Sequence, residues 1–432
     1  MKVVEVFDGI RLENGPGQLQ VPSPIMAFYG DNGQYIPINE ELLSRHMMIL
    51  GGIGTGKTNT FYQIIGQLNK AKKQDDLFII FDTKGEYLQD FYEAGDIVIS
   101  NDENARGENG SDYWNIFKEI DDNAPEESIN EIANIIFREK IEKTSQVFFP
   151  MAAKDLFAAI LTHFYRVRDK IQVDNKILRD FVDVCDGELL RELLSSHQDL
   201  YGMASYIFDD RSPQTQGVLS ELQQTLRQIF IGNFKKSGNL AMCDLLMKKA
   251  GKKIFIEYDL AQGRTLSPIY TLLFDLAIKK SLSRSRNTGN VYFITDEFSL
   301  VPNLSHVDDA VNFGRSLGIK FVIGIQNVEQ IFDIYGESRA RSLLSGFLTS
   351  IVFNLNEPTS KQYVQGLHGK NRKKEIFQSS ISSRGISEQI RDAYVVEDWD
   401  IASLATGEAI ISMPGTGPFK FKFARMRWSN VL

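Results

Sequence analysis

Short runs of apolar residues alternate with helix-length segments along most of the chain. The runs cover residues 47–50, 77–81, 254–258, 291–295, 321–325, 351–355 and 409–413. Strands that are apolar along their whole length are typical of a parallel sheet covered by helices on both faces. The pattern therefore predicts an α/β fold with a central, mostly parallel sheet.

Residues 121–250 interrupt this alternation with helical periodicity. Leu156, Ile160 and Phe164 recur at the spacing of one helix face, and strand-like runs are scarce in this stretch. We therefore predict an all-α domain at 121–250, inserted between a first sheet-forming part at 1–120 and a second at 251–432. Two interpretations of the insertion remain open, a lid of packed helices or a domain that contacts the substrate.

Composition and charge limit the classes of function. The 432 residues include 48 Lys and Arg against 56 Asp and Glu, a net charge of −8, so any contact with nucleic acid must be local. Cys185 and Cys243 are far apart and lack metal-ligand spacing, which argues against a disulfide framework or a zinc site. With no run of 18 apolar residues, we expect a cytoplasmic protein without a membrane span.

A glycine-rich loop follows the first of the apolar runs and precedes an amphipathic helix. It fits G-x-x-x-x-G-K-[ST], in which glycines let backbone N–H groups approach phosphate oxygens at a helix N-terminus. Lys57 is expected to contact the β- and γ-phosphates and Thr58 to hold Mg²⁺. The predicted nucleotide-binding residues are Gly51, Gly52, Ile53, Gly54, Thr55, Gly56, Lys57, Thr58 and Asn59.

A carboxylate at a strand end must complete such a site. Asp82, Asp259 and Asp296 all follow apolar runs, but among them Asp296 is the one followed directly by a second acid, Glu297. We predict that Asp296 orients Mg²⁺ and that Glu297 polarises the attacking water. Asp82 stays open as an alternative metal ligand.

Two further polar residues are candidates for catalysis. Residues 305–317 predict a helix that carries Arg315, followed by Gly318, and the next strand ends at Gln326. An amide at the tip of a neighbouring strand is well placed to sense the γ-phosphate. An arginine near a ring interface would reach a neighbour's nucleotide, and the alternative for Arg315 is a solvated helix residue.

Taken together, these blocks resemble the type IV secretion coupling proteins, the conjugative DNA-transfer ATPases of the FtsK–HerA superfamily. The resemblance rests on segments in family order, namely 49–58, 81–86, 113–115, 294–298, 314–319, 324–326 and 335–336. It implies a RecA-like P-loop NTPase domain with an inserted all-α domain and ATP and Mg²⁺ as ligands. By the same resemblance, Arg315 matches the arginine that acts across the subunit boundary and Gln326 matches the sensor.

The resemblance also implies partners. The family forms homohexameric rings and passes DNA or nucleoprotein to a secretion channel, and a monomer without nucleotide or DNA is the open alternative. Because the family usually begins with a transmembrane segment and none is found here, we expect a membrane protein to anchor the chain, through residues 1–40, at the cytoplasmic face of the membrane. The alternative for residues 1–40 is that they add β structure to the core. The sequence also departs from the family in Thr83, where proline is common, and in the linker 299–303, which lacks the usual glycine.

Two basic segments stand out against the acidic background. One is 370–374, which we expect to be a loop, and the other is an alternating strand from Lys420 with Arg425 and Arg427 beyond it. Both are candidates for phosphate contacts, and the alternative for both is solvated charge on a loop and on an edge strand, where lysines discourage aggregation. Two other functions remain open, a soluble HerA-like ATPase in DNA processing or phage defence and a nucleotide-gated substrate receptor that does not pump.

Overall fold

The main element of the fold is a nine-stranded sheet. The structure is a computed structural model, and it describes residues 2–102, 112–283, 289–377 and 387–426. Across the sheet the order is β14 (Phe419–Lys422), β13 (Glu408–Ser412), β10 (Thr349–Val352), β4 (Met47–Leu50), β9 (Ile319–Ile325), β8 (Val291–Thr295), β5 (Leu77–Asp82), β7 (Lys252–Glu257) and β6 (Ile97–Ile99). It is parallel from β10 to β6, and β13 and β14 add antiparallel strands at one edge. The predicted central, mostly parallel sheet is confirmed, and each predicted apolar run overlaps one of its strands.

Both faces of the sheet are buried, which explains why its strands are apolar throughout. Met47 and Ile49 of β4 face a core shared with α1 (Glu40–Leu43), α2 (Lys57–Ala71), α3 (Glu86–Phe91) and the hairpin of β2 (Met26–Tyr29) and β3 (Tyr35–Ile38). Met48 and Leu50 face the opposite core. The helices on that side are α10 (Gly263–Leu282), α11 (Val307–Phe313), α12 (Val328–Tyr335), α13 (Glu337–Ser345), α14 (Pro358–His368) and α15 (Asp398–Ala402).

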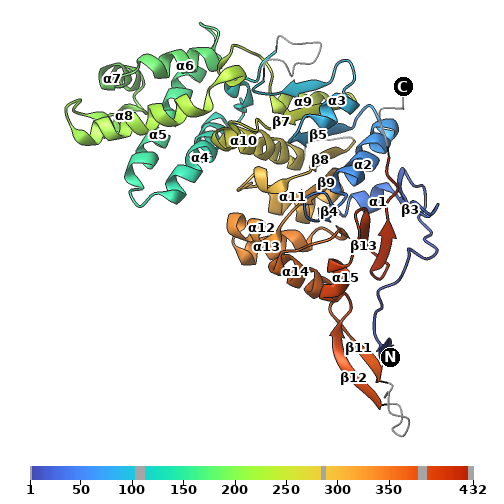
Figure 1. The fold of residues 1–432 in the computed structure, drawn as a ribbon. Helices are drawn as coiled ribbons and strands as arrows, with labels where there is room; N and C mark the ends of the chain where they lie inside the picture. Colours follow the sequence, from blue (N-terminus) through green and yellow to red (C-terminus); the bar gives the residue numbers. More distant parts are fainter. Residues whose placement is uncertain (1, 103–111, 284–288, 378–386, 427–432) are drawn as a thin grey trace.

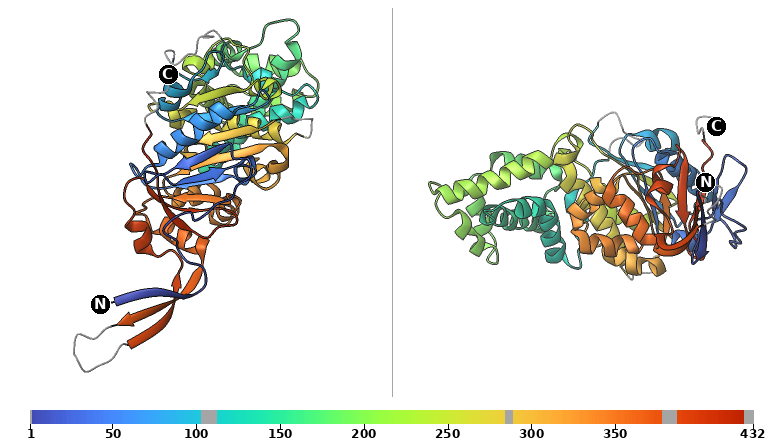
Figure 2. Two further views of the ribbon diagram at one scale, coloured as in Figure 1. Left: turned by 90° about the vertical axis from the view of Figure 1, so that its right-hand side faces the viewer. Right: turned by 60° about the horizontal axis from the view of Figure 1, so that its bottom comes forward.

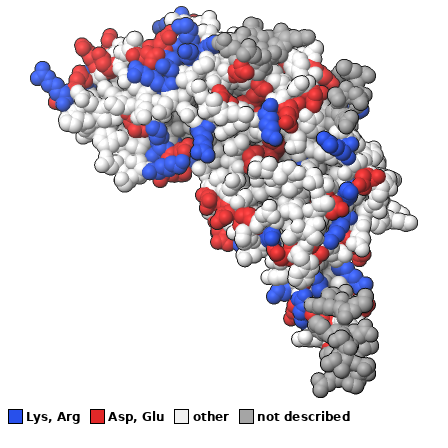
Figure 3. Space-filling view, viewed as in Figure 1, with Lys and Arg blue, Asp and Glu red and all other residues white. Residues whose placement is uncertain are grey.

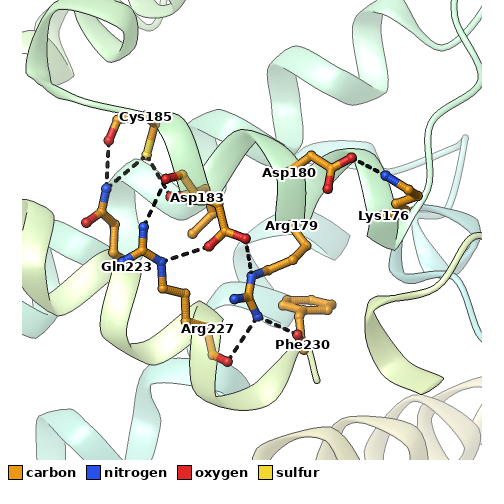
Figure 4. Close-up of polar contacts among 9 residues, drawn as sticks. Lys176, Arg179, Asp180, Asp183, Cys185, Gln223, Arg227 and Phe230 are labelled. Atoms are coloured by element: carbon orange, nitrogen blue, oxygen red, sulfur yellow. Dashed lines mark hydrogen bonds and ion pairs between the residues drawn. The ribbon is translucent and has the colours of Figure 1, made fainter. Parts of the chain in front are cut away.

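Helices also make up the middle of the chain, where the sequence predicts an insertion. The α-helices are α4 (Pro125–Lys143), α5 (Phe148–Val167), α6 (Asn175–Val184), α7 (Gly187–Ser195), α8 (Pro213–Ile229) and α9 (Met242–Lys248). Figure 1 shows α4 to α8 gathered at one end of the molecule, beyond the sheet. There α6 and α8 are joined by Asp183, which accepts from Arg179 at 3.0 Å and from Arg227 at 2.9 Å (Figure 4).

Two buried asparagines tie the base of this helical part together. Asn115 Nδ2 donates to Val173 O at 3.1 Å and to Gly238 O at 2.9 Å, and Asn175 Nδ2 donates to Trp114 O at 2.8 Å and to Phe234 O at 2.9 Å. The hydrophobic core of these helices is also continuous with the α10 face of the sheet. The insertion is therefore firmly packed on the sheet, although its domain boundaries at 121 and 250 stay a prediction.

A three-stranded antiparallel arm projects from the opposite end of the molecule (Figure 1). It consists of β1 (Lys2–Asp8), β11 (Lys370–Phe377) and β12 (Ser387–Tyr394), with β1 beside β11 (Figure 2). The expectation of a loop at 370–374 is wrong, because this stretch pairs along its whole length with β12. From Arg372 onward it also pairs with β1. Within the described ranges, none of the helices is long and apolar enough to cross a membrane.

Candidate active site at the carboxyl edge of the sheet

The glycine-rich loop joins β4 to α2 and wraps around the first turn of that helix. Gly54 has φ 72° and Gly56 has φ 125°, conformations that favour glycine. A Cβ on Gly51 would lie 2.7 Å from Phe353 Cβ, so the loop also needs glycine for close packing. No side chain in the described part of the chain caps α2, which leaves its first N–H groups to an anion.

Lys57 lies at the start of α2 and folds back over the loop. Its Nζ donates to Gly51 O and, at 3.1 Å, to Gly52 O. Burial lowers the pKa of Lys57, while the nearby Glu297 and Asp296 carboxylates act in the opposite direction. The ammonium therefore lies in a partly desolvated position close to both acids.

Strand order explains why distant sequence motifs meet at this edge. Strand β9 lies between β4, which leads into the loop, and β8, which leads into Asp296. Gln326 directly follows β9, so it lies between the other two groups. The strands approach closely here, because a Cβ on Gly324 would lie 2.2 Å from Asp296 O. Glycine at 324 therefore allows the two strand ends to meet.

Asp296 is a buried carboxylate with an unusual pKa. Thr83 Oγ1 lies 3.2 Å from its Oδ1 and 3.1 Å from its Oδ2. Burial raises the pKa of Asp296 to about 7, and the neighbouring Asp82 carboxylate adds to this. A carboxylate in this state is suited to a cation, because a bound cation would favour the ionised form. The contact of Thr83, at the position where the family commonly has proline, with Asp296 is one that the sequence did not predict.

Glu297 is only 8% exposed, and its two oxygens differ. Ser299 Oγ donates to Oε1 at 2.6 Å, whereas Oε2 is buried without a hydrogen-bond partner among the described residues. Burial raises the pKa of Glu297, and Ser299, Lys57 and Gln326 each lower it. A buried, unpartnered carboxylate oxygen is an acceptor ready for a water or a hydroxyl proton.

The carboxylates of the two other strand-end aspartates accept hydrogen bonds from backbone N–H groups of the residues that follow them. Asp82 accepts N–H bonds from Lys84 at 3.1 Å, Gly85 at 2.9 Å and Leu88 at 2.8 Å. Asp259 accepts from Ala261 at 2.8 Å and from Gln262 at 3.0 Å. These contacts begin α3 and α10, so they assign both residues to chain turns. The D-x-x-G spacing of Asp82 and Gly85 is the sequence signal for this role.

Arg315 lies at the opposite edge of the sheet from the loop. The predicted helix over 305–317 ends early, at Phe313, and Arg315 stands in a 3-10 turn that leads into β9. Its Nη2 lies 3.3 Å from Glu41 Oε1, and its side chain is 53% exposed. The structure thus brings Lys57, Asp296, Glu297 and Gln326 together in one protomer but leaves Arg315 outside that group.

Two members of the predicted loop site have other surroundings. Asn59 Nδ2 donates to Ala424 O at 3.0 Å, and Asn59 Oδ1 accepts from Met426 N at 3.0 Å. The Asn59 side chain therefore links α2 to the segment after β14. Its role in nucleotide binding stays a prediction. Ile53 at the loop tip is 88% exposed, so it contributes backbone rather than packing.

The basic segments are largely neutralised by acids. In β11, Arg372 lies 3.6 Å from Asp392, Lys373 lies 3.2 Å from Glu397 and Lys374 lies 2.7 Å from Glu388. Figure 3 shows basic side chains interspersed with acidic ones on the face that it draws.

The second basic segment behaves in the same way. As predicted, it is an edge strand, β14, with Phe421 buried, and Lys420 and Lys422 lie 3.4 Å from Asp400 and 3.2 Å from Asp31. Arg427 lies outside the described residues. The acidic partners of both segments argue against a phosphate-binding track.

This arrangement is similar to that of known proteins. The model of the type IV secretion-system coupling protein DNA-binding domain matches residues 33–418. Coupling protein TraD of Escherichia coli (strain K12) is 22% identical over an alignment of 403 residues, and the match covers 89% of this chain and 53% of TraD. The chain therefore spans about half the length of this curated relative.

Solved structures show the same fold. The bacterial conjugative coupling protein TrwBdeltaN70 in its unbound monoclinic form has a TM-score of 0.77 at 18% identity, covering 95% of this chain and 91% of that one. Plasmid coupling protein TrwB in complex with ADP and Mg²⁺ has a TM-score of 0.75 at 17% identity, covering 99% and 96%. VirB4 of Thermoanaerobacter pseudethanolicus follows at 0.59 and 13%, covering 95% and 99%. The expected RecA-like P-loop fold is confirmed.

Proposed function

The chain belongs to the family of type IV secretion-system coupling proteins, and from this premise we propose that it is an ATPase that delivers DNA or nucleoprotein to a type IV secretion or conjugation channel. The observation that carries the proposal is the convergence of Lys57, at the start of α2, with Asp296 and Glu297, which follow β8. These are the phosphate-binding, metal-binding and water-polarising groups that nucleotide hydrolysis needs. That TrwB is known in complex with ADP and Mg²⁺ supports the choice of ligand.

The residues around the loop fit a magnesium-bound triphosphate. Oxygen ligands are what Mg²⁺ prefers, and the Thr58 hydroxyl and the buried Asp296 carboxylate would provide them. When bound, Mg²⁺ neutralises charge that develops on the phosphate oxygens. Asp82 fits this role less well, because its oxygens already accept three backbone N–H bonds.

The remaining side chains of the site have separate tasks. Lys57 stabilises the charge on the β- and γ-phosphates. Glu297 Oε2 accepts a hydrogen bond from the attacking water and takes its proton as the bond to phosphorus forms and ADP leaves. Ser299 holds Glu297 Oε1 at 2.6 Å and so fixes which oxygen faces the water. Gln326 lies beside Glu297 and lowers the pKa of that group, which places it to respond to the γ-phosphate.

Assembly and partners extend the proposal. A homohexameric ring would place Arg315 of one subunit at the nucleotide of the next. A membrane protein of the channel would hold the ring at the cytoplasmic face of the membrane. If the chain is a receptor without a motor, ATP turnover will not rise when DNA is added, whereas a motor predicts stimulation. Purification together with a nuclease would instead favour the soluble DNA-processing function.

Site-directed variants test the proposal directly. Lys57→Ala should abolish ATP turnover, because it removes a charge that stabilises the transferred phosphoryl group. Glu297→Gln should retain ATP binding and lose turnover by about two to three orders of magnitude. Both are measured as phosphate release and as binding of a fluorescent ATP analogue.

The control for these variants is Lys70→Ala, in the last turn of the same helix, which should behave as wild type. Turnover by Glu297→Gln at the wild-type rate would refute the assignment of the catalytic base. A wild-type protein that binds no ATP would refute the proposed function as a whole.

A further inference from the structure

The segment from Ser299 to His306 leads from the catalytic carboxylate to α11 and is held at its far end by α10. Thr271 Oγ1 donates to Pro302 O at 3.1 Å. The Asp275 carboxylate, fully buried, accepts the backbone N–H of Ser305 at 2.8 Å and that of His306 at 3.0 Å. Both donor and acceptor side chains lie in α10, which packs on the sheet, so the sheet domain itself holds this end of the segment.

Helix α4 of the helical insertion holds the same stretch from the other side. Arg138 donates from Nη1 to Asn303 O and from Nη2 to Ser305 Oγ, the latter at 2.6 Å. Two turns earlier on the helix, Glu131 lies 2.6 Å from His306 Nε2 and also pairs with Lys279 of α10. The insertion thus contacts the segment through the two hydrogen bonds of Arg138 and through the contact between Glu131 and His306.

The backbone at the point of contact is unusual. Asn303 has φ 57°, a left-handed conformation that asparagine tolerates better than most residues. Its carbonyl is the acceptor for Arg138. The linker that lacks the expected glycine therefore uses an asparagine for the turn, and a side chain of the insertion binds the carbonyl of that turn.

The near end of the segment contacts the reacting group. Ser299 Oγ donates to Glu297 Oε1 at 2.6 Å, which leaves the buried Oε2 as the oxygen for water. Ser299 and Arg138 both line a cavity of about 600 Å³, together with Asn303 and residues of α12. Val301 and Leu304 anchor the segment in the core, while open space lies beside Ser299 and Asn303. On this open side the hydrogen bonds of Arg138 hold the backbone in place.

We propose that Arg138 and Glu131 are positioning residues for Glu297, through which the helical insertion sets the orientation of the catalytic carboxylate. The insertion would then influence ATP hydrolysis through the contacts that α4 makes with this segment. This inference rests on the proposed function, since it assumes that Glu297 polarises the attacking water. Neither residue touches the nucleotide loop; both act on the Ser299–His306 segment.

The first test compares Arg138→Met with wild type in steady-state ATP hydrolysis. We expect kcat to fall about tenfold, because loss of two hydrogen bonds lets the carboxylate leave its productive orientation. KM and the affinity for a fluorescent ATP analogue should not change, since the phosphate loop is untouched. Arg138→Lys should give an intermediate kcat, because a lysine cannot form both bonds from one planar group.

A double-mutant cycle separates positioning from general damage. Ser299→Ala removes the other end of the connection, so it should lower kcat to a similar extent. If both residues act through the same segment, the double variant should be hardly slower than either single variant. Lys140→Met is the control, because Lys140 lies on α4 as well but pairs with Glu221 at 3.3 Å inside the insertion; it should keep wild-type kcat.

Several outcomes would overturn the proposal. These are an unchanged kcat in Arg138→Met, a change confined to KM, or effects of Arg138→Met and Ser299→Ala that multiply in the double variant. If Arg138→Met does not fold, Glu131→Gln is tested in its place, because it weakens the contact with His306 at the same segment. The expected changes in kcat and KM are the same. Failure of the proposed function is distinguishable, because the wild-type protein would then show no ATP hydrolysis at all.

Discussion

Adjacent acids at the end of β8 differ in their environment. Asp296 has both oxygens close to one hydroxyl, whereas Glu297 has one oxygen bound and one unpartnered. Sequence spacing could predict that both are present at the end of β8. It could not predict Thr83 or Ser299, because a hydroxyl becomes a partner only through the packing of neighbouring strands and turns.

Glu257, at the end of β7, offers a test of buried charge outside the proposed catalytic group. Burial raises the pKa of Glu257 to about 7. A folded-state pKa above the unfolded one means that the folded protein binds the proton more tightly. Its contribution to stability is therefore complete below the ordinary value of 4.5 and is lost as the pH rises through about 7.

We expect Glu257→Gln to raise the free energy of unfolding at pH 8 by about 1–2 kcal/mol, after allowing for partial exposure, and to change little at pH 5. Thermal denaturation across this pH range measures the effect. The exposed Glu192→Gln on α7 is the control and should show no such trend. A gain in stability that is equal at both pH values would show that ionisation of Glu257 is not its cause.

At the scale of elements, apolar strands were predictable and polar ones were not. The strands of the central sheet are buried on both faces, so their composition marks them. Strand β11 carries Lys370, Arg372, Lys373 and Lys374, because its neighbours supply paired acids rather than an apolar core. Such a strand has the composition of a loop, and only the position of its partners identifies it.

The helix predicted over 305–317 shows how packing ends an element. A Cβ on Gly314 would lie 2.9 Å from Ile319 Cβ, so the chain comes into close contact with β9 at this point. It tightens into the turn Gly314–Leu317 and leaves through Gly318 at φ 79°. The glycines at 314 and 318 were visible in the sequence, but the strand that demands them was not.

Asp82 separates a turn-forming role from a metal-binding one. Because its carboxylate accepts three N–H bonds at the start of α3, Asp82→Ala should lower the free energy of unfolding by about 1–3 kcal/mol. The Mg²⁺ concentration for half-maximal ATP hydrolysis should stay within a factor of two or so of wild type. Asp296→Ala should do the reverse, with Mg²⁺-dependent turnover lost and the fold retained. Equal loss of Mg²⁺ dependence in both variants would reinstate Asp82 as a metal ligand.

At the scale of the whole molecule, the position of Arg315 means that a role in catalysis would need a second subunit. Strand β9 has 7 residues and separates Arg315 from Gln326, a distance of about 20 Å along an extended strand. Arg315 therefore lies too far from the nucleotide site of its own chain to contact it. In a head-to-tail ring, the edge of one copy that carries Arg315 would meet the edge of the next copy that carries the nucleotide site. The surface ion pair with Glu41 is worth only about 0–1 kcal/mol, so Arg315 can leave it at little cost.

This geometry predicts that ATP turnover depends on assembly. If Arg315 acts as an arginine finger, Arg315→Ala should lose about three orders of magnitude in kcat or more, and wild-type specific activity should rise with protein concentration. Arg341→Ala is the control, since Arg341 is also exposed and pairs with Glu337; it should retain activity.

Mixing provides the decisive measurement. Arg315→Ala has an intact nucleotide loop and Lys57→Ala has an intact arginine, so each protein alone is inactive for a different reason. In a mixed ring, some interfaces pair an intact loop with an intact arginine from the neighbouring subunit. Phosphate release should therefore reappear on mixing, and it should peak when both proteins are present in comparable amounts. If rings that contain both proteins stay inactive, Arg315 does not act across the boundary, and its role is limited to the ion pair with Glu41 at the edge of its own sheet.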